Sequence, residues 1–103
     1  MKGTEKQIAW ANDIRSNILD TCDANIARFR ESIPEYATVF SAIRDKCVAL
    51  LSIIEKNPQA EDASFWIENR DRLPNPVRIS EQVSLMMSNG KSLNEALKTI
   101  FGF

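Results

Sequence analysis

Residues 22–47, CDANIARFRESIPEYATVFSAIRDKC, hold one proline at the junction of two stretches whose apolar residues recur every three or four positions. This spacing places the apolar side chains of each stretch on one face of a helix. Pro34 lacks a backbone donor and restricts the residue before it, so we expect the first helix to end near Ile33. The short link between the two helices predicts an antiparallel hairpin.

The apolar residues of the two stretches also predict how the hairpin is aligned. In an antiparallel pair, residues at the same height have numbers that add to one constant. Five apolar pairs share the same sum, and we expect their members to face each other: Phe29 with Phe40, Ile26 with Ile43, Cys22 with Cys47, Leu19 with Leu50, and Ile18 with Leu51.

The two cysteines are predicted to be reduced, buried thiols that act as small apolar side chains. Packed helix axes lie about 8–10 Å apart, whereas a disulfide needs Cα atoms closer than about 7 Å. Because the chain contains no histidine and only two cysteines, a zinc site is not expected.

The outer segments predict further helices and complete an all-helical fold. Thr4 and Gln7 form a capping box that starts the first helix, and Ser92 and Glu95 form another near the C-terminus. Ser80 is expected to cap the helix between them. We predict a single domain, 1–103, in which a hairpin of 4–33 and 35–56 is followed by a cross helix at 58–72, a stiff connector and a short helix pair within 80–103.

The cross helix is expected to fold over the open end of the hairpin. This arrangement would set Trp66 near Trp10 and Ile14, with both indole rings buried. Large buried aromatic side chains contribute much of the stability of a small core.

Composition excludes several function classes. Thirteen Lys and Arg against fourteen Asp and Glu give a net charge of −1, which disfavours a strongly basic nucleic-acid binder. The absence of histidine excludes imidazole general bases and Ser-His-Asp triads. No phosphate-binding glycine motif is present. We therefore expect no enzyme activity and no cofactor.

The N-terminal residues do not resemble a secretory signal, and no apolar run reaches the ~20 residues of a membrane helix. We therefore expect a cytoplasmic protein without a membrane partner.

Two motifs and one apolar pair supply candidate binding residues. Residues 6–15 are KQIAWANDIR and residues 65–70 are FWIENR, in which aromatic side chains precede arginine as in stacking sites. Adjacent methionines on a helix cannot both face one core, so one of them is expected at the surface. The candidates are Trp10, Arg15, Trp66, Asn69, Arg70 and Met87.

The pattern KQIAWA-x-x-IR followed by FWI-x-NR resembles a family of small uncharacterised proteins from phages and mobile elements of Firmicutes-type bacteria. The resemblance covers about a quarter of the chain. It implies a phage or mobile-element setting and supplies no catalytic residues.

Three functional hypotheses follow. The first is a non-enzymatic helical protein that binds a host or phage protein, with an anti-CRISPR-like, counter-defence inhibitor as one concrete form. The second is a DNA-binding regulator that uses the C-terminal pair as a helix-turn-helix, although few cations are available there. The third is a structural homo-oligomer held together by C-terminal apolar residues.

Overall fold

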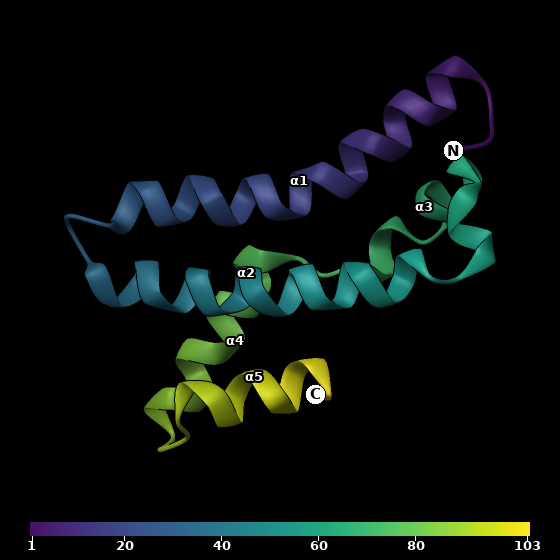
Figure 1. Cartoon of the computed structure of the whole chain (residues 1–103). Coiled ribbons are helices and arrows are strands. Elements are labelled where there is room, and N and C mark those ends of the chain that lie inside the picture. Colours follow the sequence, from purple (N-terminus) through teal and green to yellow (C-terminus); the bar gives the residue numbers. More distant parts are fainter.

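The computed structural model describes all 103 residues and confirms the all-helical prediction, with no strand (Figure 1). Two long helices lie side by side, and the shorter elements follow them along the chain. The elements are α1 (Glu5–Phe29), α2 (Pro34–Glu55), η1 (Pro58–Glu61), α3 (Ala63–Glu68), η2 (Arg70–Arg72), α4 (Pro76–Ser88) and α5 (Leu93–Phe101), where η marks a 3₁₀ helix.

Helices α1 and α2 form the predicted antiparallel hairpin (Figure 1). Two of the five predicted pairs are confirmed by direct contact. Cys22 and Cys47 are fully buried, and each thiol shifts the pKa of the other, while the rings of Phe29 and Phe40 stack with centroids 6.3 Å apart. The other three pairs, Ile26 with Ile43, Leu19 with Leu50 and Ile18 with Leu51, stay predictions.

The turn between the long helices begins earlier than predicted. Helix α1 ends at Phe29 instead of near Ile33, and the residues between form the turn. Ile33 has a non-helical backbone (φ −138°, ψ 79°) because it precedes proline, and Pro34 occupies the first position of α2. A proline is well tolerated there because the first backbone N–H groups of a helix have no partner within it.

The prediction of one cross helix at 58–72 is wrong, since this region consists of η1, α3 and η2. The break falls at Asp62, whose backbone is extended and pairs with the N-terminal segment. The Lys2 N–H donates to the Glu61 carbonyl at 2.6 Å, and the Ala63 N–H donates to the Lys2 carbonyl at 2.7 Å. These bonds attach the N-terminus to the start of α3.

Helix α4 also begins earlier than predicted. Asn75, and not Ser80, is the N-cap, and its side-chain oxygen accepts a hydrogen bond from the Arg78 N–H at 3.2 Å. The sequence Asn75-Pro76 combines a good capping residue with a proline suited to the first helical position. The capping boxes of Thr4 with Gln7 and of Ser92 with Glu95 are both confirmed.

The two tryptophans differ in burial. Trp66 is 1% exposed, and its indole N–H donates to the Ala60 carbonyl at 2.9 Å. Trp10 is 49% exposed, so the prediction that it lies in the core is wrong. The small residues Ala11 and Ala63 are fully buried, because α1 turns Ala11 and not Trp10 toward the core under α3.

The chain is elongated for its length. Only 16 of 103 residues are buried, and the radius of gyration is 14.9 Å, against about 13 Å for a compact chain of 100 residues. Figure 1 shows α4 and α5 extending away from the hairpin on the α2 side. Most side chains therefore lie at or near the surface.

Replacing the two tryptophans in turn tests whether Trp66 is packed in the core and Trp10 lies at the surface. We expect Trp66→Ala to lower the free energy of unfolding by about 3–5 kcal/mol, because it leaves a cavity and an unpaired carbonyl. We expect Trp10→Ala to cost less than about 1 kcal/mol, as for other surface changes. Urea denaturation measures both values, and equal losses in the two variants would contradict the packing described.

Candidate functional site

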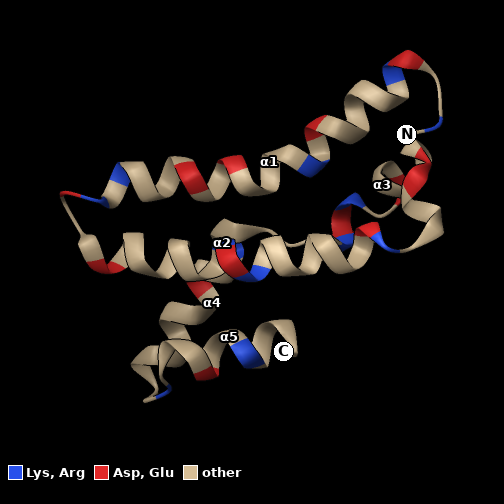
Figure 2. Cartoon of the chain, viewed as in Figure 1, with Lys and Arg blue, Asp and Glu red and all other residues tan.

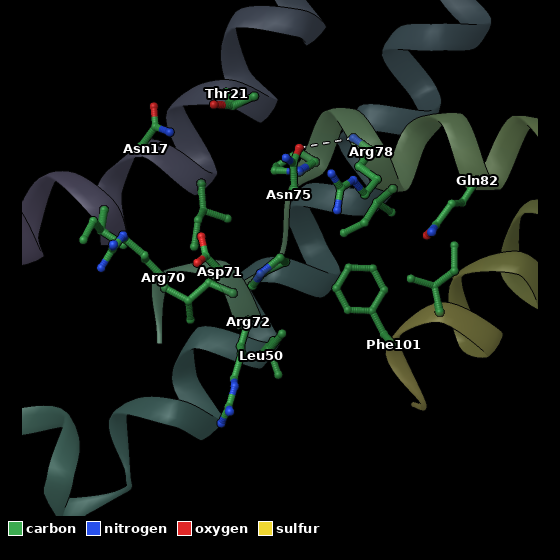
Figure 3. A pocket seen from close by; sticks show the side chains of 17 residues that line it. Asn17, Thr21, Leu50, Arg70, Asp71, Arg72, Asn75, Arg78, Gln82 and Phe101 are labelled. Atoms are coloured by element: carbon green, nitrogen blue, oxygen red, sulfur yellow. Dashed lines mark hydrogen bonds between the residues drawn. The ribbon is translucent and has the colours of Figure 1, made fainter. Parts of the chain in front are cut away.

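A groove of about 800 Å³ lies between the residue 70–76 connector and helices α1, α2, α4 and α5 (Figure 3). We call it the arginine groove, because three arginines line it together with an apolar wall. The arginines are Arg70, Arg72 and Arg78, and the wall includes Ile14, Ile18, Leu50, Leu73, Ile79, Ile100 and Phe101.

The connector that carries Arg70 and Arg72, and that leads into α4 with Arg78, is stiff. Pro74 and Pro76 each fix a backbone dihedral angle, and Pro76 is buried at the start of α4. Arg72 therefore lies just before this rigid segment and Arg78 just after it. The two prolines reduce the conformational freedom that the groove would lose on binding a ligand.

None of the three arginines forms an ion pair. The ion pairs of the chain join Arg15 to Glu55 and Arg44 to Asp23. Asp71 is the only carboxylate in the groove lining, which leaves a formal lining charge of +2 from three arginines and one aspartate. The groove is thus locally positive in a chain whose net charge is −1.

The close-up view shows how the arginines are arranged. Arg70 extends toward α1, Arg78 lies on the α4 side, and Arg72 points away from both, past Leu50 (Figure 3). A bound segment would therefore meet guanidinium groups at separate places along the groove, and not one compact cluster.

Trp10 lies beside this groove. The Arg70 guanidinium carbon is 5.3 Å from the centroid of the Trp10 ring, a distance typical of a cation–π contact. Ile14 and Asn17 line both the arginine groove and a smaller depression that includes Trp10. We call the combination of Trp10, this depression and the arginine groove the docking surface.

Three of the predicted binding residues have structural roles. Trp66 is buried, so it cannot contact a partner in the folded chain. Arg15 pairs with Glu55, and its guanidinium carbon lies 5.7 Å from the Trp66 ring centroid. The Asn69 side-chain amide donates to the Phe65 carbonyl at 2.8 Å. These contacts hold α3 together and fix it to the hairpin.

The structure brings Trp10 and Arg70 together and leaves Met87 apart. Met87 is 41% exposed, whereas Met86 packs partly against the core, so one methionine faces outward as predicted. Met87 lines neither the groove nor the depression beside Trp10.

Sequence reasoning missed Arg72 and Arg78. A signal was present, because an arginine stands two residues before Pro74 and another two residues after Pro76. The predicted start of this helix at Ser80 placed Arg78 in a loop, so its position in the first turn of α4 was not anticipated.

The two buried thiols alter each other's pKa. The hydrogen bond between the side chains lowers the pKa of Cys22 and raises the pKa of Cys47. Both residues are free cysteines, as predicted, and both are fully buried. They lie within the hairpin and line none of the grooves described here.

No group of three or more His, Cys, Asp or Glu side chains is placed to hold a metal ion. No helix is both long enough and apolar enough to cross a bilayer. Comparisons with protein-family models, curated proteins and solved structures find no match to this chain.

Burial of the thiols can be tested by their reactivity. We expect Cys22 and Cys47 to react with a disulfide reagent only as fast as the hairpin opens, since the thiolate must reach solvent to attack. A Ser52→Cys variant, with its added thiol on the exposed side of α2, supplies a fast control. Rapid reaction of both native thiols in folded protein would contradict the hairpin core.

Proposed function

We propose that the chain is a non-enzymatic binding protein that docks on a host or phage protein through the docking surface. The observation that carries this proposal is the exposed Trp10 ring stacked against Arg70 at the edge of a groove. Tryptophan and arginine are the residue types most enriched among energetically dominant interface residues.

The exposed area of the chain and the chemistry of the docking surface are compatible with this proposal. A stable protein interface buries about 800 Å² on each partner, and the chain exposes 6795 Å² in total. The docking surface joins an apolar wall to arginines that form no ion pair, which matches the usual combination of an apolar centre and a polar rim.

The resemblance of residues 6–15 and 65–70 to phage and mobile-element proteins supports a counter-defence role. An anti-CRISPR-like inhibitor that covers a functional surface of a defence effector is one concrete form. Such an inhibitor would act in the cytoplasm and would need no catalytic group, because occupying the effector surface is sufficient.

A second candidate function is a homo-oligomer, favoured by two exposed apolar side chains on α4. Leu85 is 66% exposed and Met87 is 41% exposed. Light scattering over a range of concentrations, with Met87→Lys as the disrupting variant, tests this candidate. A monomer at all concentrations would remove it.

The DNA-binding hypothesis has less support. Helix α5 turns Ala96 and Leu97 into the core, and its only basic residue is Lys98. Several phosphate contacts need more cations than this helix provides.

The docking surface predicts a specific pattern in affinity capture. Tagged wild-type chain should retain a host protein that Trp10→Ala loses by at least about tenfold, because truncation of a central interface aromatic costs more than about 1.4 kcal/mol. Leu85→Ser is the matched control, since it removes a more exposed apolar side chain on α4, outside the docking surface.

Quantitative mass spectrometry compares the three captures, and calorimetry with the purified partner then gives the dissociation constants. Both variants must first show wild-type circular dichroism. Equal retention by wild type and Trp10→Ala, together with loss in Leu85→Ser, would move the binding surface to α4 and contradict the proposal.

A further inference from the structure

The three arginines of the arginine groove have no carboxylate partner within the chain, and Arg70 alone has other contacts, since its guanidinium donates to the Ile67 carbonyl at 2.5 Å and lies over the Trp10 ring. Arg70, Arg72 and Arg78 are exposed and form no ion pair, whereas Arg15 and Arg44 each pair with a carboxylate of a neighbouring helix. Arginine is well suited to carboxylate recognition, because its planar group can donate two parallel hydrogen bonds.

The start of α4 adds to the positive potential. Acidic side chains usually occupy the first turn of a helix, where they offset the positive end of its dipole. The first turn of α4 holds no acidic residue, and it carries Arg78 instead. Asp71 is the one carboxylate that lines the groove, whereas Asp13 and Asp20 line the depression beside Trp10, so the positive charge is confined to the groove itself.

We propose that the arginine groove receives an acidic segment of the partner protein that also carries apolar side chains. This inference rests on the proposed function and names the chemistry of its partner. Carboxylates of the segment would pair with Arg70 and Arg78, and its apolar side chains would lie on Ile79, Ile100 and Phe101. Arg72 points away from the other two and would contact the segment near one end (Figure 3).

The groove fits an acidic peptide better than a nucleic acid. Acidic and basic residues are interspersed along α1 and α2, so the positive region does not extend along the hairpin (Figure 2). A nucleic-acid strand needs a basic track that follows its phosphates, and the interspersed charges of the hairpin do not supply one. The apolar wall has no counterpart on a phosphate backbone, but it matches leucine or phenylalanine side chains.

A displayed library of random 16-residue peptides tests this inference. We expect selection on the wild-type chain to enrich sequences that combine Asp or Glu with large apolar residues. Synthetic copies of those peptides should bind with an affinity that falls as salt rises, because ion pairs contribute to binding. The double variant Arg72→Glu/Arg78→Glu should bind them at least about tenfold more weakly, since the reversed charges repel carboxylates.

The double variant Arg30→Glu/Lys91→Glu is the matched control. It changes the net charge by the same amount at exposed positions outside the groove, and it should keep wild-type affinity for the selected peptides. Failure to select any peptides, selection without acidic enrichment, or equal weakening in both double variants would overturn the inference. Tighter binding to a 20-nucleotide single strand or duplex of DNA, lost in Arg72→Glu/Arg78→Glu, would assign the groove to nucleic acid instead.

The captured partner separates this inference from the proposed function. If binding of that partner is lost in Trp10→Ala but unchanged in Arg72→Glu/Arg78→Glu, the inference of an acidic segment is wrong and the protein-binding function stands. If Trp10→Ala has no effect on the partner, the proposed docking surface itself is wrong.

Discussion

The close contact between α1 and α2 is the constraint on which the rest of the structure depends. Two small thiols, Cys22 and Cys47, meet at the centre of this contact with no exposed surface, and aromatic rings stack near the turn. Side-chain volume at such a contact sets how closely two helices approach. The other α-helices pack on the hairpin: α3 lies on α1, and α4 and α5 both contact α2.

The docking surface is a consequence of this arrangement. Helix α1 supplies Trp10, Ile14 and Ile18, and α2 supplies Leu50. The proline-rich connector adds Arg70 and Arg72 to the lining of the same groove. Trp66 and Arg15 contribute indirectly, because they hold α3 and thus fix the start of the connector. Burial of one tryptophan in the core thereby positions the arginine that stacks on the other.

The sequence predicted the features that depend on local chemistry. Helical spacing, the proline turn and the capping boxes at Thr4 and Ser92 each follow from residues close in the chain, and the structure confirms them. The break at Asp62 was not predictable in this way, because it depends on backbone pairing with Lys2, sixty residues earlier. The exposure of Trp10 likewise depends on which face of α1 is covered by α3.

The candidate site was predictable only in part, for the same reason. Trp10 and Arg70 stood out as residue types, but the groove exists only after four helices and the connector come together. The central claim is that a partner protein covers this surface, and hydrogen exchange of the chain with and without its captured partner measures it most directly. The account predicts slowed exchange in residues 8–18 and 67–79, with no change at 84–90. Protection confined to 84–90, with 67–79 unaffected, would contradict it.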